Sequence, residues 1–322
     1  MPVTSVTQDP AALTLTVVAD FPVPVQRLWD AYVDPRQLER FWGPPTYPAR
    51  FTRHDAAVGG ASAYAMTGPE GEVSRGYWHW LAVEPHTSFA VLDGFALADG
   101  SPNPEMPSMR MVFSFEPTQS GSRVTTTTYF TSVDDLSRLL AMGMDQGIKA
   151  AMGQMDAVLV DLRAFSVNLP TLSQVLSDTQ VRVSRVIHGS PEAGWRAHTE
   201  QALVQQWLLG PDGWTMPVCN LPAAVGDSYR YEWARDDQRF GFEGELLESV
   251  PPFRMVTTER MIGRADETTN ELTLSPLAGG TLLSLLITYP SAELRDAVLG
   301  TGMTDGMEAS YRRLESEILV SA

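Results

Sequence analysis

The chain reads LLAMGMDQGI at residues 139–148 and VLGTGMTDGM at residues 298–307. Each stretch opens a run in which apolar side chains recur every three or four residues, the spacing of one face of an α-helix. These positions are Met144, Ile148, Met152, Met155 and Leu159 in the first run, and Met303, Met307, Tyr311, Leu314 and Ile318 in the second. The repeat predicts two long helices of one design, the first over residues 133–165, and therefore two domains of one design.

Two glycines stand four residues apart in each stretch, Gly143 with Gly147 and Gly302 with Gly306. In a continuous helix this spacing puts both glycines on one face, where each costs about 1 kcal/mol relative to alanine. Glycine also leaves empty volume where a packed helix would carry a side chain. We therefore expect another group, or a bound molecule, to approach that face closely.

Composition limits the class of protein. A length of 322 residues suits two domains of ordinary size. The formal net charge of -16 argues against nucleic acid and anionic membranes as partners, since both repel an acidic surface. The single cysteine, Cys219, forms no intramolecular disulfide, and the N-terminal residues resemble no signal peptide. We expect a soluble, cytoplasmic protein.

The order of predicted elements is the same in both halves: a strand, two short helices, an antiparallel meander and a long helix. In the first half, strands are predicted at 13–21, 49–54, 60–67, 72–83, 88–92, 109–116 and 123–131, with short helices at 25–32 and 35–42. The second half begins again with a strand at 180–188 and helices at 191–199 and 201–209. We expect a first domain over 1–168 with an N-terminal tail at 1–12, a linker at 169–178, and a second domain over 179–322.

Alternation along the strands gives each predicted sheet one apolar, aromatic-rich face. Such a face can pack solidly against the long helix or enclose a ligand, and methionines beside Tyr and Trp make adaptable pocket walls. We predict that a small apolar ligand contacts Trp42, Tyr64, Met66, Trp78, Trp80, Met111, Phe113, Phe115, Met144, Gly147 and Ile148 in the first domain. The corresponding residues of the second domain are Trp207, Tyr231, Trp233, Phe240, Phe242, Leu272, Met303, Gly306 and Met307.

Several motifs resemble one family. They are the Val-Gly-Gly-x-x-x-Tyr-x-Met-x-Gly-Pro-x-Gly pattern at 58–71, the early Trp29, the Phe-Trp-Gly-Pro run at 41–44, and the Gly-Met-x-x-Gly opening at 143–147. Together they resemble the START-like helix-grip (SRPBCC) superfamily, and within it the group named after the C-terminal domain of the activator of Hsp90 ATPase. In the second half Asp227 replaces a glycine and the Gly-Pro-x-Gly turn is missing, so the two pockets need not bind the same molecule.

The resemblance implies an α+β fold with two tandem helix-grip domains. In each, a curved antiparallel sheet wraps around a long C-terminal helix, and two short helices follow the first strand. It also implies three functions. The leading one is a binding protein for a hydrophobic small molecule. The others are a cyclase- or aromatase-like enzyme acting on an apolar aromatic or polyketide substrate, and a partner of an Hsp90-type chaperone.

The sequence contains no catalytic or cofactor motif that decides between these functions. The five histidines and Cys219 do not share a metal-ligand spacing, and there is no phosphate loop or nucleophile elbow. Carboxylates near strand ends, such as Glu72 and Asp93, could act in acid–base chemistry, but no motif singles one out. We predict neither a metal nor a cofactor, and interpret Cys219 as a small buried hydrophobe.

Overall fold

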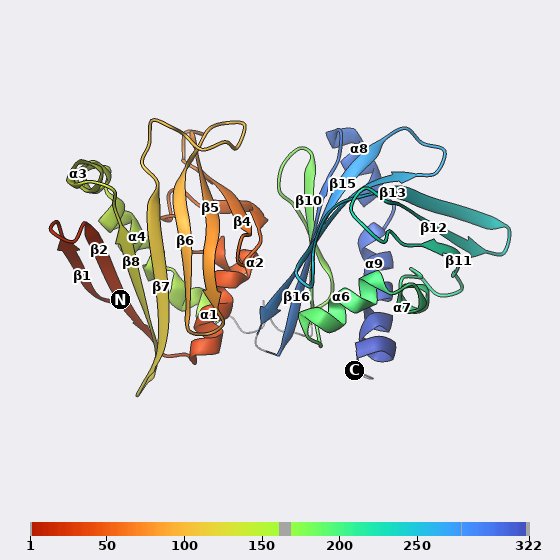
Figure 1. The fold of residues 1–322 in the computed structure, drawn as a ribbon, viewed down its shortest axis with the longest axis horizontal. Coiled ribbons are helices and arrows are strands. Elements are labelled where there is room, and N and C mark those ends of the chain that lie inside the picture. The colour runs from red at the N-terminus through yellow and green to blue at the C-terminus, as the bar shows by residue number, and fades with distance from the viewer. Residues whose placement is uncertain (1, 161–168, 278, 320–322) are drawn as a thin grey trace. The chain divides into compact units, whose positions relative to one another are not determined.

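The computed structural model describes residues 2–160, 169–277 and 279–319. The chain divides into two compact units, Met1–Phe165 and Ser166–Ala322. In its described residues, each unit contains one eight-stranded antiparallel sheet and a set of helices (Figure 1). This arrangement confirms the predicted α+β class and the tandem organisation.

The first unit follows the predicted order of elements. Its sheet runs β1-β2-β8-β7-β6-β5-β4-β3. The strands are β1 Val3–Asp9, β2 Thr14–Phe21, β3 Ala49–His54, β4 Ala61–Thr67, β5 Val73–Glu84, β6 Ser88–Ala96, β7 Met109–Thr118 and β8 Gly121–Tyr129. The helices are α1 Val25–Val33, α2 Pro35–Leu38, α3 Val133–Ala141, α4 Met144–Gly153 and α5 Met155–Val160.

The second unit repeats this plan. Its sheet runs β11-β12-β13-β14-β15-β16-β10-β9. The strands are β9 Leu172–Val175, β10 Gln180–Ile187, β11 Thr215–Asn220, β12 Ser228–Arg235, β13 Gln238–Val250, β14 Arg254–Met261, β15 Glu267–Leu277 and β16 Gly280–Thr288. The helices are α6 Pro191–Thr199, α7 Gln201–Trp207, α8 Ala292–Leu299, α9 Met303–Arg313 and a terminal π-helical turn, Leu314–Ile318.

Two strands lie where the sequence predicts a tail and a linker. β1 falls within the expected tail at 1–12 and pairs with β2, while β9 falls within the expected linker at 169–178 and pairs with β10. Both are edge strands with mostly exposed side chains. Backbone hydrogen bonds to one neighbouring strand hold them in place. Their side chains need not alternate between apolar and polar, so the pattern that predicts the other strands does not mark these two.

The prediction of one continuous helix over 133–165 is wrong. Gly143 has φ 85° and forms the N-cap of α4, which ends the preceding helix and redirects the chain. Gly302 has φ 81° and does the same before α9. Positive φ is the conformation that glycine tolerates best, so these two residues lie outside the helices and do not share a face with Gly147 and Gly306. Residues 161–165 of the predicted helix lie outside the described residues.

The first sheet packs on a core of aromatic rings. Trp29 of α1 meets Phe115 edge-on, with ring centroids 5.3 Å apart, and Phe89 stacks on Phe113 at 4.4 Å. Trp80 is also buried in this cluster, 4.9 Å from Phe89. Edge-to-face and offset aromatic contacts of this kind add to the free energy gained by burying the rings.

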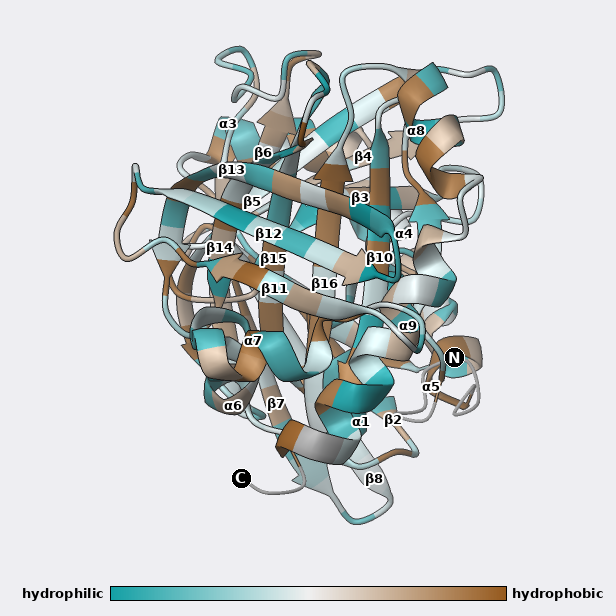
Figure 2. Ribbon diagram, turned by 90° about the vertical axis from the view of Figure 1, so that its right-hand side faces the viewer, coloured by the Kyte–Doolittle hydropathy of each residue, from teal (hydrophilic) through white to brown (hydrophobic). Residues whose placement is uncertain are grey.

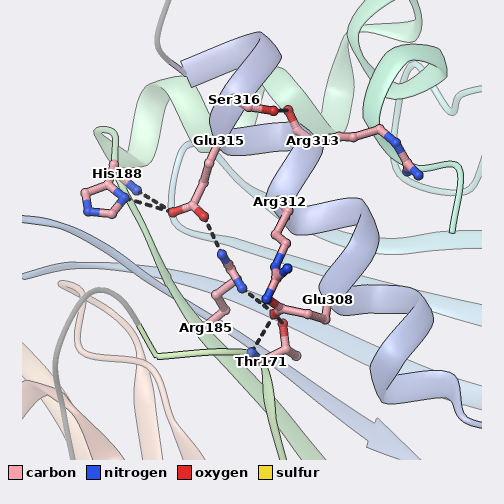
Figure 3. A network of polar contacts seen from close by, with 8 residues as sticks. All are labelled: Thr171, Arg185, His188, Glu308, Arg312, Arg313, Glu315 and Ser316. Atoms are coloured by element: carbon pink, nitrogen blue, oxygen red, sulfur yellow. Dashed lines mark hydrogen bonds and ion pairs between the residues drawn. The ribbon is translucent and has the colours of Figure 1, made fainter. Parts of the chain in front are cut away.

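A buried network of ion pairs connects the second sheet to the C-terminal helical segment of its domain (Figure 3). Arg185 of β10 bonds to both Glu308 and Glu315, which lie two turns apart on the C-terminal helical segment. Thr171 donates to Glu308 from its backbone N–H at 2.7 Å and from Oγ1 at 2.8 Å. Although burial disfavours the carboxylate, the bonds from Thr171, Arg312 and Arg185 lower the pKa of Glu308 to about 2. The network fixes the helix against β10.

Along the strands, hydrophobic and hydrophilic residues interleave, as in β13 (Figure 2). The inward side chains of β13 include Phe242 and Leu246, whereas Glu243 points outward and pairs with Arg230 and Arg260. This alternation is the basis for dividing every strand into an inward and an outward set. The inward set of each sheet defines the surface on which a ligand site can form.

Candidate ligand-binding site

A carboxyl group, that of Asp93, lies on the inward face of the first sheet. Asp93 belongs to β6, where alternation puts it on the same face as the buried Phe89 and Val91. Its partner across the ladder is Trp78 of β5, which donates from Nε1 to Asp93 Oδ1 at 2.8 Å. The hydroxyl of Tyr64 on β4 donates to the same oxygen at 3.1 Å. Three neighbouring strands therefore meet around one carboxyl group.

The environment of Asp93 changes its protonation. Burial raises the pKa of Asp93 to about 7, although the hydrogen bonds from Trp78 and Tyr64 oppose this by stabilising the carboxylate. Burial and the nearby Asp93 raise the pKa of Tyr64 well above its usual value, so its hydroxyl stays a donor. At neutral pH Asp93 is therefore populated in both its charged and its neutral form.

Glu259 occupies the matching position in the second sheet. In the first sheet Trp80 pairs with Val91, and Asp93 follows two residues later on β6. In the second sheet Leu246 pairs with Thr257, and Glu259 follows two residues later on β14. Each carboxyl thus lies two residues beyond an equivalent inward pair.

The partners of Glu259 differ from those of Asp93. Tyr229 of β12 directs its hydroxyl to Glu259 Oε2 at 3.3 Å and to the Thr258 carbonyl at 2.8 Å. A Cβ atom added at Gly244 would lie 1.9 Å from the Thr258 carbonyl oxygen and 2.8 Å from the Tyr229 ring, so the backbone and this ring together occupy the space that a side chain at 244 would need. Desolvation raises the pKa of Glu259, while hydrogen bonds from Asn270 and Tyr229 oppose the rise.

The predicted ligand-binding residues of the first domain fall into two groups. Trp78, Trp80 and Phe113 are at most 1% exposed, and Met111 and Phe115 at most 5%. A side chain with almost no accessible surface has little room beside it for a bound molecule, so the structure places these five in the core. The half-buried group comprises Trp42, Tyr64, Met66, Met144, Gly147 and Ile148.

The second domain is more open. Trp207, Trp233 and Leu272 are buried, and Phe240, which is 38% exposed, stacks on Trp233 with ring centroids 5.1 Å apart. The remaining predicted residues are half-buried although they lie on inward faces: Tyr231, Phe242, Met303, Gly306 and Met307. Water therefore reaches part of the inward apolar surface in this domain.

Space is also present beside the helices that follow the left-handed glycines. Among the described residues, a Cβ atom added at Gly147 would meet no atom within 4 Å, and one at Gly306 would meet only Pro211 Cδ at 3.8 Å. Both glycines stand three residues after the first residue of their helix, Met144 or Met303. The two domains thus leave room at equivalent helix positions.

A separate, polar hollow lies on the outer side of α9. It has a volume of about 420 Å³ and is lined by Asp212, Asp305, Glu308, Ala309, Arg312, Arg313 and Ser316. Helical spacing puts Asp305 and Arg312 on the opposite side of α9 from Met303 and Met307. This hollow is therefore distinct from the apolar inward face.

The structure also shows where the other candidate residues from the sequence lie. Cys219 is buried in β11, and burial raises the pKa of its thiol to about 11, so the thiol stays protonated at neutral pH. His79 is exposed, as expected from its place between two inward tryptophans.

Among the described residues, no three His, Cys, Asp or Glu side chains could hold a metal ion together. In the same part of the chain, no helix has the length and hydropathy needed to cross a membrane.

Sequence reasoning did not single out the two carboxyl groups. Asp93 is one of several carboxylates near predicted strand ends, and no sequence motif marks Glu259. The signal was nevertheless present, because F-x-V-x-D at 89–93 matches M-x-T-x-E at 255–259. In both patterns an acidic residue takes a position on the inward face of its strand, which is unusual unless the acid is hydrogen-bonded.

Several proteins of known structure are similar to parts of this chain. A protein of Mycobacterium smegmatis with a known crystal structure is 44% identical, over 50% of this chain and 98% of its own, with a TM-score of 0.47. A protein of Arthrobacter aurescens is 41% identical, over 49% of this chain and 91% of its own, with a TM-score of 0.47. A protein of Rhodobacter sphaeroides is 30% identical, over 48% of this chain and all of its own, with a TM-score of 0.46. No curated protein matches the chain.

The model of one protein family matches the chain twice. The family is described as Activator of Hsp90 ATPase homolog 1-like protein, and the matches cover residues 22–160 and 188–318. Each match lies within one of the two compact units. The chain therefore belongs to the Activator of Hsp90 ATPase homolog 1-like family, of which it carries two domains in tandem.

Proposed function

We propose that the protein binds small, largely apolar molecules between the inward face of each sheet and the helix that follows the left-handed glycine. The proposal depends on one observation above all: inward apolar side chains remain half-buried on both sides of this space. The helices contribute Met144 and Ile148 in the first domain, and Met303 and Met307 in the second. A ligand that covered them would gain about 25 cal/mol for each Å² of apolar surface removed from water.

The apolar core of the second domain is divided into separate clusters, and this division supports the binding proposal. Tyr231 and Phe242 pack against a cluster around Trp233, whereas Met255 packs against a cluster around Leu272. Among the described residues, Met307 contacts the Leu272 cluster and a third cluster around β10. Half-buried side chains between separate clusters are the surroundings expected for an adaptable pocket.

An enzyme is the second candidate, and one observation favours it. The pKa of Asp93 is raised to about 7, which suits a general acid or base at neutral pH. The reaction would be of the cyclase or aromatase type on an apolar aromatic or polyketide substrate. Turnover of such a substrate, lost in Asp93→Asn, would favour this alternative over binding alone.

The proposal also covers the partners of the protein and its location in the cell. A role beside an Hsp90-type ATPase depends on the family description, and co-purification with such an ATPase would support it. At a net charge of -16 we propose neither nucleic acid nor membrane as a partner. We propose a reducing, cytoplasmic location, in keeping with the single cysteine, whose thiol is buried.

The binding proposal is tested by titrating the full chain with N-phenyl-1-naphthylamine, an apolar dye that fluoresces in apolar surroundings. We expect saturable binding to the wild type. Gly147→Leu should fill the space beside α4, and Gly306→Leu the space beside α9, so each should remove the signal of its own domain.

Gly153→Leu is the matched control. Gly153 lies on the same helix as Gly147 and is exposed, and no atom of the described residues lies within 4 Å of a Cβ added there. It should leave dye binding unchanged. The proposal fails if the wild type does not bind the dye, or if the dye binds equally well to the Gly147→Leu, Gly306→Leu double variant.

A further inference from the structure

The first domain holds a carboxyl group with unused hydrogen-bonding capacity. Trp78 Nε1 and the Tyr64 hydroxyl both donate to Asp93 Oδ1. Among the described residues none donates to Oδ2. Asp93 keeps 8% of its surface accessible, so the group is not sealed. A carboxylate offers about four acceptor sites, so at least two are available to a bound molecule.

The carboxyl group is not explained as an ion pair. Its protonation responds to burial, Trp78 and Tyr64, and no guanidinium or ammonium group in the described part of the chain contributes. Placing an unpaired carboxyl group on an apolar face costs free energy unless hydrogen bonds compensate. Two neutral donors compensate in part, which leaves Asp93 suited to accept a third donor from outside the protein.

The second domain presents the same group by different means. Glu259 takes the equivalent register position, yet its donors are Tyr229 and Asn270 in place of an indole and a different tyrosine. The Asn270 carbonyl accepts from Thr268 Oγ1 at 3.2 Å, which turns the Asn270 amide N–H₂ toward Glu259. The shared feature of the two domains is the inward carboxyl group, whereas its supporting residues have changed.

We propose that Asp93 and Glu259 each accept a hydrogen bond from an O–H or N–H group carried by the otherwise apolar ligand. The inference rests on the proposed binding function and specifies its ligand: an apolar body with one neutral hydrogen-bond donor. The carboxyl oxygen orients the ligand, and the methionines and aromatic rings cover its body. The more polar surroundings of Glu259, with Thr268 and Asn270, suit a ligand with a second polar group.

Two probes of nearly equal shape test the inference on the full chain. One is 2-naphthol, which carries a hydroxyl donor, and the other is 2-methylnaphthalene, which carries a methyl group instead. A hydrogen bond to a charged acceptor should favour 2-naphthol by about tenfold in dissociation constant. In Asp93→Asn and Glu259→Gln one carboxyl oxygen becomes an N–H₂ donor, while the remaining oxygen can still accept from the protein's own donors. Each variant should therefore lose the preference in its own domain while still binding 2-methylnaphthalene.

The control variant is Asp99→Asn, which removes an exposed carboxylate that bonds only to Ser101 among the described residues. It should keep the full preference. Equal binding of both probes by the wild type, or an unchanged preference in the Asp93→Asn, Glu259→Gln double variant, would overturn the inference and leave the binding function intact. Binding of neither probe by the wild type would instead overturn the binding function itself, and this inference with it.

Discussion

Two glycines of the first domain have opposite roles although they lie four residues apart. Gly143 has φ 85° and ends a helix, whereas Gly147 lies inside α4, where a Cβ atom would meet no described residue within 4 Å. Gly147→Ala should therefore raise the free energy of unfolding by up to about 1 kcal/mol, because alanine is the better helix former. Gly143→Ala should lower it by about 1 to 2 kcal/mol, because alanine is strained at positive φ.

Urea unfolding of the two alanine variants measures both effects. Gly302→Ala, at φ 81°, should repeat the loss in the second domain. A loss of stability in Gly147→Ala would show that the helix is packed there, and would remove the space that the binding proposal needs.

Asp93 should make the first domain less stable as the pH rises. Its pKa is about 7 in the folded chain against 3.8 for an ordinary aspartate, so the folded state binds the proton more tightly. The folded state then holds more protons than the unfolded state between about pH 4 and pH 7, and the free energy of unfolding falls across that range. Full loss of this contribution is on the order of 4 kcal/mol.

Asp93→Asn cannot ionise and should therefore lack this slope. Comparing urea unfolding of the variant and the wild type at pH 5 and pH 7.5 isolates the contribution of Asp93, since all other groups titrate in both proteins. Equal changes in the two proteins would show that Asp93 is not held in its neutral form by burial.

For single residues, the sequence predicts the inward apolar side chains well and the inward carboxyl groups poorly. Alternation alone assigned Trp78 and Phe113 to one face. The predicted strand at 88–92 ends just before Asp93, whereas β6 runs to Ala96. An aspartate at a strand end is expected to face solvent, because its burial requires donors that other strands must supply. For Asp93 those donors are Tyr64 and Trp78, and neither can be assigned before the register is known.

Among the elements, the C-terminal helix of the second domain depends on one arginine. Arg185→Met should lower the free energy of unfolding by about 3 to 5 kcal/mol, because it leaves Glu308 and Glu315 without their buried partner. Arg196→Met is the control, since Arg196 is 61% exposed and pairs with Glu200 one turn away. Its effect should stay below about 0.5 kcal/mol.

Thermal unfolding at neutral pH, followed by circular dichroism, distinguishes the two arginines. Similar small losses in both variants would mean that the network shown in Figure 3 does not hold the helix.

Most elements were predictable because their signals are local. Strands and short helices followed apolar periodicity, and Pro35 and Pro191 mark two helix starts. The break before α4 was missed because glycine is compatible with both a helix interior and a left-handed cap. β1 and β9 were missed because edge strands are held by backbone bonds that leave no pattern in the side chains.

For the whole molecule, the two compact units should fold independently. Residues 1–165 and 166–322, expressed separately, should each unfold in one cooperative transition. A shorter fragment, 176–322, lacks β9 and Thr171, and loses two hydrogen bonds to Glu308. It should be less stable than 166–322 by about 1 to 3 kcal/mol.

Urea unfolding of the three fragments tests the boundary. Equal stability of the two C-terminal fragments would restore the view of residues 169–178 as a simple linker. Failure of 1–165 and 166–322 to fold separately would show that the duplicated domains now depend on each other.

The most direct test of ligand binding is methyl NMR of the full chain labelled at methionine, with 2-naphthol as the ligand. Binding on the inward faces should shift the methyl signals of Met144, Met303 and Met307, which are half-buried beside the proposed sites. The signal of Met142, which is exposed, should stay in place. Saturable shifts confined to the first group are the predicted result; no shifts, or a shift at Met142 alone, would contradict the account.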